Sequence, residues 1–204
     1  MLKNILFDFD GVILDSMPIR DFGFREIFKK FPQEQVEKLI EFHRKNGGLS
    51  RFVKIKYFFE EIRGEKISEE KILEIANTFS QIMKNELANK KYLIGQTLEF
   101  LKESNHNLHI VSGSEEKELQ FLCEQLEISH LFISIHGSPT PKGKLVAELI
   151  EKQKYKKAET ILIGDSINDY EASFENGIEF YGYNNSELQK FKYLTSFDPI
   201  WKLS

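Results

Sequence analysis

The spacing of the apolar residues changes twice along the chain. Residues 4–7 (NILF) form a short apolar run, as expected of a strand buried in a parallel sheet. From Ser16 to Lys91 apolar side chains recur at helical spacing, and beyond Gly95 short apolar runs alternate with amphipathic segments. Further strands are predicted at 108–112, 131–135, 160–164 and 178–181, with helices at 98–102, 115–126, 144–152 and 169–176. This alternation predicts an α/β fold with a doubly wound, Rossmann-like parallel sheet.

The helical segment is predicted to be an insertion, because one strand precedes it and the others follow. A helix with apolar residues at 36, 39 and 40 ends at Gly47-Gly48. Ser50 and Ser68 are suited to cap the two helices that come next. We therefore expect an all-helical cap domain at 16–92, inserted into an α/β core made of 1–15 and 93–204.

The composition is that of an ordinary globular protein, with 204 residues, 41% of them hydrophobic and 29% charged, and a net charge of −4. No run approaches the roughly 18 apolar residues of a membrane helix, and a large basic nucleic-acid surface is disfavoured. The single cysteine, Cys123, excludes an internal disulfide framework, and the histidines show no metal-ligand spacing. Because no signal peptide is visible, we expect a cytoplasmic protein with no nucleic-acid or membrane partner. The oligomeric state stays open.

Polar residues follow the predicted strands at the points where each strand ends. In such sheets ligands bind at the carboxyl ends of the strands. The residues concerned are Asp8 and Asp10, Ser112 and Gly113, Lys142 and Lys144, and Asp165 and Asp169. Asp8 and Asp165 offer the oxygen ligands that Mg²⁺ prefers, and Lys142 could offset the anionic charge. Ser112 and nearby backbone N–H groups could hold a phosphate oxygen, while a carboxylate can attack phosphorus as a nucleophile.

These motifs resemble those of the haloacid dehalogenase-like hydrolases. The first motif, DxDGxxxDS, is present at residues 8–16, and a strand that ends in serine matches residues 110–114. An isolated lysine and the motif GDxxxD at residues 164–169 complete the set, in the family's order. The insertion after the first motif is similar to the small helical cap that one branch of the family carries.

The resemblance implies a role for each matching position. Asp8 would be the nucleophile that forms an aspartyl-phosphate and would also bind Mg²⁺. Asp10 would act as general acid and then as general base, and its backbone carbonyl would be a metal ligand. Ser112 would bind the phosphoryl group, together with the backbone at Gly113. Asp165 would complete the protein ligands to the metal, with Asp169 close behind. Of the two available lysines, Lys142 is preferred over Lys144 because it precedes the helix expected to begin near residue 144.

Substrate specificity is expected to lie in the cap. Arg51 and Lys54 are three residues apart and share a helix face, so both could reach the leaving group, and Arg20 is a weaker candidate. The leading hypothesis is a Mg²⁺-dependent phosphatase of a small phosphorylated metabolite, possibly a sugar phosphate. A phosphosugar mutase of the β-phosphoglucomutase type is the close alternative. A phosphonate-cleaving enzyme would need an imine-forming amine such as Lys54 or Lys56, and a non-enzymatic phospho-signalling or binding module is a distant alternative.

Overall fold

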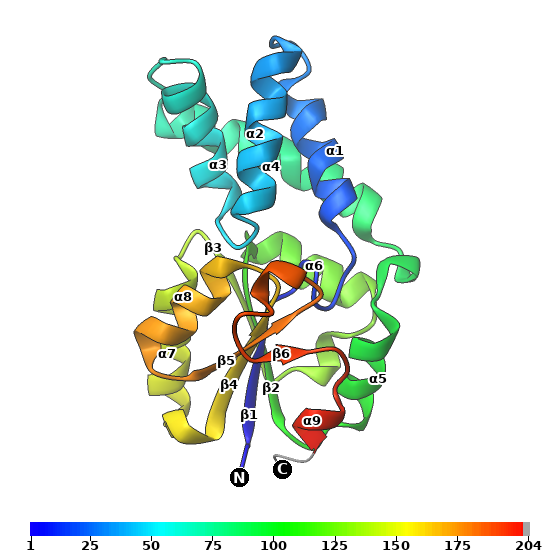
Figure 1. The fold of residues 1–204 in the computed structure, drawn as a ribbon. Coiled ribbons are helices and arrows are strands. Elements are labelled where there is room, and N and C mark those ends of the chain that lie inside the picture. The colour runs from blue at the N-terminus through cyan, green and yellow to red at the C-terminus, as the bar shows by residue number, and fades with distance from the viewer. Residues whose placement is uncertain (202–204) are drawn as a thin grey trace.

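A six-stranded parallel sheet forms the centre of the computed structural model, which describes residues 1–201 (Figure 1). The last residues of the expected core, 202–204, lie outside the described residues. The strands are β1 (Asn4–Phe7), β2 (Asn107–Glu115), β3 (Ser134–Ser138), β4 (Thr160–Gly164), β5 (Glu179–Tyr183) and β6 (Tyr193–Leu194), in the order β3-β2-β1-β4-β5-β6. The predicted doubly wound α/β fold is therefore confirmed. The chain crosses from one side of β1 to the other after β3, which is the type of switch point where ligands bind in such sheets.

Helices cover both faces of the sheet. They are α5 (Gly95–Glu103), α6 (Glu116–Gln125), α7 (Lys142–Gln153), α8 (Ile167–Asn176) and the short α9 (Asp198–Trp201). One buried cluster joins the apolar residues of α5 and α6 to one face of β1, and a second joins those of α7 and α8 to the other. β1 is therefore buried on both faces, which is why its sequence is a continuous apolar run.

Between β1 and α5 the chain forms a helical segment that stands over the carboxyl ends of the strands (Figure 1). It contains α1 (Met17–Phe28), α2 (Gln33–Lys45), α3 (Arg51–Tyr57), a π-helical turn (Phe58–Ile62) and α4 (Glu69–Leu87). Its interior is aromatic: the rings of Phe28 and Phe58 stack at 4.1 Å, and those of Phe24 and Phe79 lie 4.5 Å apart. The hydroxyl of Ser50 accepts a hydrogen bond from the Val53 backbone, so it caps α3 as expected.

Predicted boundaries differ from those observed by up to three residues, and two of the differences have a local cause. β3 begins at Ser134 and not at residue 131, because Ser129–Leu131 forms a 3₁₀ turn that ends the connection from α6. α7 begins at Lys142, directly after Pro141, so Lys142 is the first residue of the helix and does not precede it. β6 has two residues and carried no pattern that could reveal it. The other strands and helices of the sheet region lie within a few residues of their predicted positions.

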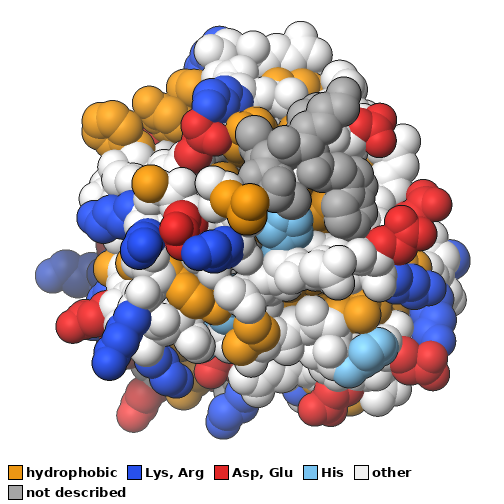
Figure 2. All heavy atoms as spheres, turned by 90° about the horizontal axis from the view of Figure 1, so that it is seen from below, with side chains coloured by type: hydrophobic (Ala, Val, Ile, Leu, Met, Phe, Trp, Pro, Cys, Tyr) orange, Lys and Arg blue, Asp and Glu red, His pale blue; other side chains and the backbone are white. Residues whose placement is uncertain are grey.

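The opposite end of the molecule has a mixed surface. Figure 2 shows the face at the amino ends of the strands, where positively and negatively charged side chains are interspersed in the part that the structure describes. A nucleic-acid-binding surface instead concentrates positive charge. Among the described helices, none combines the length and the apolar character that a membrane crossing requires.

Candidate active site

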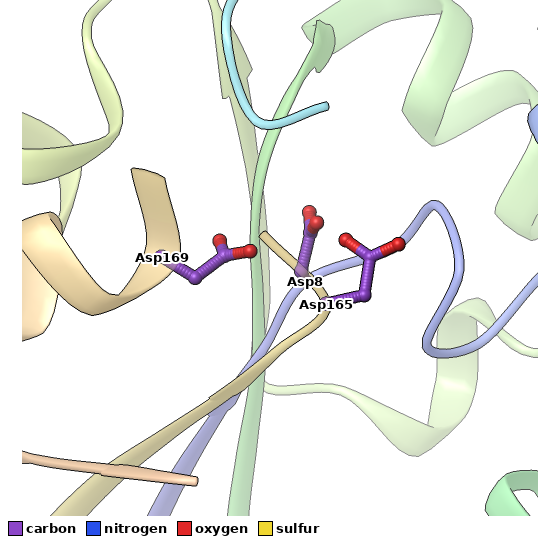
Figure 3. Close-up of side chains that lie close together, drawn as sticks. All are labelled: Asp8, Asp165 and Asp169. Carbon is purple, nitrogen blue, oxygen red and sulfur yellow. The ribbon is translucent and has the colours of Figure 1, made fainter. Parts of the chain in front are cut away.

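Three carboxylates meet at the carboxyl end of the sheet. Asp8 follows β1, Asp165 follows β4, and Asp169 lies in the first turn of α8 (Figure 3). One carboxylate oxygen from each residue lies within 4.8 Å of the others. Gly11 makes this approach possible, since its φ is +76° and a Cβ at this position would lie only 1.9 Å from Asp165 Oδ2.

Lys142 lies among these carboxylates. Its Nζ is 2.9 Å from Asp8 Oδ1, and it also forms an ion pair with Asp169. The other oxygen of Asp169 accepts hydrogen bonds from the backbone N–H and the hydroxyl of Ser166, at 3.0 and 2.6 Å. The oxygens of Asp169 are thus occupied within the chain. Lys144, by contrast, is exposed and lies 3.7 Å from Glu148, so of the two candidate lysines it is Lys142 that reaches the site.

Burial makes negative charge costly in this cluster. It raises the pKa of Asp8 to about 7 against the lowering effect of Lys142, and the charges of Asp169 and Asp10 add smaller contributions in the same direction as burial. Burial and the charges of Asp8 and Asp169 also hold the pKa of Asp165 well above its usual value. The single ammonium of Lys142 does not offset the charge of three carboxylates. A hard divalent cation with oxygen ligands, such as Mg²⁺, fits the free oxygens of Asp8 and Asp165.

The Asp10 carboxylate lies in a different environment from that of Asp8. It accepts hydrogen bonds from the Ser16 hydroxyl, from Arg20 Nε at 3.0 Å and from Ser114 Oγ at 2.5 Å. Burial alone would raise the pKa of Asp10, but the charge of Arg20 and these hydrogen bonds outweigh it and lower the pKa to about 2. Two carboxylates separated by one residue therefore have pKa values that are pushed in opposite directions, a pattern typical of acid–base sites.

A buried ion-pair network joins the helical segment to the sheet region. Glu118 of α6 is fully buried, and its Oε1 accepts a hydrogen bond from Arg20 Nη1 at 2.5 Å while its Oε2 pairs with Arg51. Arg51 also donates to Ser80 Oγ at 2.5 Å and lies over the ring of Phe79. Arg20 and Arg51 line the pocket as expected, but their guanidinium groups are engaged by partners inside the protein.

The pocket lies between the helical segment and the carboxyl ends of the strands. Its walls include Asp8, Asp10, Arg20, His43, Arg51, Lys54, Ser112, Gly113, Ser114 and Asp165. Lys54 is buried and donates from Nζ to the Gly47 carbonyl at 3.0 Å. Burial lowers the pKa of Lys54 to about 7, helped by Arg20 and opposed by Asp10. The space open to the centre of a water molecule is about 30 Å³, enough for roughly two waters.

Ser112 and Gly113 form the end of β2 beside this pocket. Ser112 is buried, and its Oγ accepts a hydrogen bond from the Ser114 backbone at 3.1 Å. A Cβ on Gly113 would lie 2.3 Å from the Gly48 carbonyl oxygen. The loop after α2 therefore rests directly on the backbone that follows β2, and the pocket is closed on this side.

A family model described as haloacid dehalogenase-like hydrolase matches residues 5–183. The chain belongs to this family. Among curated proteins, phosphoglycolate phosphatase of Haemophilus influenzae is 25% identical over 195 residues, covering 89% of this chain and 87% of that protein. The phosphorylated carbohydrates phosphatase of Thermotoga maritima is 23% identical and covers 91% of this chain and 87% of that protein.

Solved structures share the fold of this haloacid dehalogenase-like hydrolase. The β-phosphoglucomutase of Clostridium difficile has a TM-score of 0.77 at 19% identity, over 99% of this chain and 96% of that one. A predicted phosphoglycolate phosphatase from Haemophilus somnus has a TM-score of 0.72 at 18% identity, over 99% and 97% of the two chains. These likenesses establish the architecture of the sheet and its connections.

Three residues that line this hydrolase's pocket or pair with residues that line it were not predicted as site residues from the sequence. Ser114 lies inside the second motif, and its hydroxyl contacts Asp10. Glu118 sits within a helix, where a charged residue is expected to face water, and nothing local distinguishes it. His43 shares a helix face with apolar residues, which indicates burial but not that the ring borders a pocket.

Proposed function

We propose that this hydrolase is a phosphatase that removes the phosphoryl group from a small metabolite of the cytoplasm through an aspartyl-phosphate. The juxtaposition of Asp8, Asp165 and Lys142 in one buried cluster carries the proposal. It combines a carboxylate nucleophile, a place for Mg²⁺ and a fixed cation beside the reacting oxygen. Two curated relatives are named as phosphatases of phosphoglycolate and of phosphorylated carbohydrates, which supports a small phosphorylated substrate.

Each side chain then has a definite task. Asp8 attacks phosphorus, and Lys142 beside it stabilises the negative charge on the nucleophile and on the phosphoryl oxygens. The Ser112 hydroxyl and the backbone at Gly113 hold the phosphoryl group. Asp165, with Asp8 and the backbone carbonyl of Asp10, would hold Mg²⁺. Bound there, the ion supplies Lewis-acid neutralisation of the developing charge.

Asp10 is proposed to protonate the leaving-group oxygen and then to deprotonate the water that cleaves the intermediate. Its low pKa shows that beside Arg20 it is ionised, so in the arrangement described it can act as a base but not as an acid. Separation from Arg20 removes the charge that keeps Asp10 ionised. We therefore propose that Asp10 leaves Arg20 when substrate enters.

The helical segment is proposed to act as a cap domain at residues 16–92 over a core that includes 1–15 and continues from residue 93. The pocket has room for roughly two waters and is closed on one side by the contact between Gly48 and Gly113. A phosphorylated metabolite is larger than this space. Substrate entry therefore requires the cap to move away from the sheet, and its return excludes water from the reaction.

Release of inorganic phosphate from a panel of phosphorylated metabolites, with Mg²⁺ and with a chelator in its place, tests the proposal. Hydrolysis that depends on Mg²⁺ and is abolished in Asp8→Asn is the expected result. Glu148→Gln, which changes an exposed carboxylate far from the cluster, is the matched control. Sugar-phosphate isomerisation without phosphate release would identify a mutase, and activity retained by Asp8→Asn would refute the nucleophile.

A further inference from the structure

The ring of His43 borders the pocket, and no described residue forms a hydrogen bond with it. The side chain belongs to α2, is 3% exposed, and packs against the ring of Phe24 at 4.9 Å. Neither Nδ1 nor Nε2 has a hydrogen-bond partner among the described residues. A buried polar atom without a partner costs free energy, on the order of 1–3 kcal/mol. A ligand that enters the pocket can remove that cost.

The charge of Asp21 favours a proton on one of the two ring nitrogens. Its Oδ1 lies 3.8 Å from His43 Nε2, beyond hydrogen-bond distance, and has no hydrogen-bond partner among the described residues, whereas its Oδ2 accepts two hydrogen bonds from Arg44, at 2.9 and 2.6 Å. A carboxylate accepts and does not donate, so the proton of a neutral imidazole belongs on Nε2. Nδ1 then carries the free lone pair.

The imidazole is neutral in this environment. Burial holds the pKa of His43 well below its usual value, and the nearby cations Lys54, Arg20 and Arg44 act in the same direction against Asp10. Of these three cations, Lys54 has the largest effect on the pKa of His43, but it donates its hydrogen bond to the Gly47 carbonyl and not to the ring. The ring that borders the pocket therefore carries an acceptor for which no described residue supplies a donor.

We propose that His43 selects substrates whose leaving group carries a hydroxyl, which donates a hydrogen bond to Nδ1, and that Asp21 is the positioning residue that fixes this tautomer. The inference rests on the proposed phosphatase function. It separates this protein's substrate from phosphoesters such as phosphoglycolate, whose leaving group has no further hydroxyl. A site built to bind a hydroxyl rejects the analogue that lacks it, because the buried acceptor is then left unpaired.

A series of small phosphate esters tests the proposed preference for a hydroxyl in the leaving group. The series is ethyl phosphate, 2-hydroxyethyl phosphate and glycerol 1-phosphate, with p-nitrophenyl phosphate as a general substrate. We expect kcat/KM for the better substrate of the two hydroxylated esters to exceed kcat/KM for ethyl phosphate by about tenfold or more. His43→Phe keeps a ring without nitrogen, and the preference should fall below about threefold. His43→Asn keeps an acceptor near the position of Nδ1 and should retain more of the preference than His43→Phe.

Asp21→Asn tests the positioning role. Arg44 has only donors, so it retains the amide oxygen and turns the amide N–H toward His43 Nε2. The imidazole proton then moves to Nδ1, and the preference for a hydroxyl should weaken although the ring is unchanged. His130→Gln, at an exposed position outside the pocket, is the control and should keep the wild-type preference.

The outcomes are distinguishable. If none of the esters is hydrolysed in the presence of Mg²⁺, the phosphatase function fails and this inference falls with it. If p-nitrophenyl phosphate is hydrolysed but the wild-type protein does not prefer hydroxylated esters, the phosphatase function stands and the role of His43 is refuted. An unchanged preference in His43→Phe would refute it equally, and circular dichroism of each variant establishes that the fold is intact.

Discussion

The Lys142 ammonium lies 2.9 Å from Asp8 Oδ1 and pairs at the same time with Asp169. A single cation thus stabilises two buried carboxylates, one of which is the proposed nucleophile. Lys142→Met leaves those charges uncompensated, and we expect kcat/KM for phosphate release to fall by at least about 10²-fold. Lys144→Met removes an exposed lysine two residues away and should change kcat/KM for phosphate release by less than about twofold. Equal losses in the two variants would contradict the assignment.

Substitutions at Gly11 and Gly64 form a matched pair for testing the proposed metal site. Both have positive φ, +76° and +68°, so alanine is strained at either position by about 1–2 kcal/mol. A Cβ at Gly64 would meet no atom of the described residues within 4 Å, whereas at Gly11 it would collide with Asp165. Gly11→Ala should lower Mg²⁺ affinity by at least about tenfold in calorimetric titration, and Gly64→Ala should leave it unchanged. Identical affinities would show that Asp165 is not a ligand.

Glu118 compensates two buried arginines, one from α1 and one from α3. Glu118→Gln removes the negative charge that Arg20 and Arg51 share, so both buried guanidinium groups lose an ion-pair partner. We expect the free energy of unfolding, measured with urea, to fall by about 3 kcal/mol or more. Glu124→Gln, at an exposed position of the same helix, should change it by less than about 0.5 kcal/mol. A loss as small as the control's would mean that the network adds nothing to stability.

The buried imidazole of His109 predicts a pH-dependent loss of stability. It is hydrogen-bonded to Ser134 and Tyr155, and burial, with His136 nearby, lowers its pKa to about 4. Between pH 6.5 and 4 the unfolded chain binds the proton that the folded state excludes, so stability falls as the pH falls. The contribution is at most about 1.4 kcal/mol per pH unit.

Urea unfolding at pH 5 and pH 7 measures this slope. His109→Gln should reduce the difference between the two pH values relative to the wild-type protein, whatever it does to the absolute stability. His130→Gln, at an exposed position, should leave the difference as it is. A slope that survives His109→Gln unchanged would assign the pH dependence to other groups.

The sequence predicted most reliably what depends on local pattern. β1 and β4 were predicted at their observed bounds, because each is a buried apolar run that ends in a polar motif. The rule that ligands bind at the carboxyl ends of parallel strands predicts that Asp8 and Asp165 lie together. β3 was displaced because residues 131–135 are almost continuously apolar, and such a run does not reveal where a turn ends and a strand begins.

The contacts between segments far apart in the chain could not be predicted from the sequence. The pairing of Glu118 with Arg20 spans 98 positions, and a glutamate in a helix gives no sign that it is buried. Arg51 was expected to reach a ligand, but its charge is taken up by Glu118 and Ser80. The orphaned nitrogens of His43 become visible only when every neighbour of the ring is known. Long-range electrostatic compensation therefore has to be observed in three dimensions.

The backbone contact between Gly113 and Gly48 sets how closely the helical segment can approach the sheet region. At this point neither of them presents a side chain, so the main chains touch directly. A methyl group on Gly113 would collide with the Gly48 carbonyl and keep the helical segment away from the sheet region. Bulk solvent would then reach Asp8, the proposed nucleophile, at every stage of the proposed reaction, and the proposed acyl-phosphate would no longer be shielded from water before the leaving group departs.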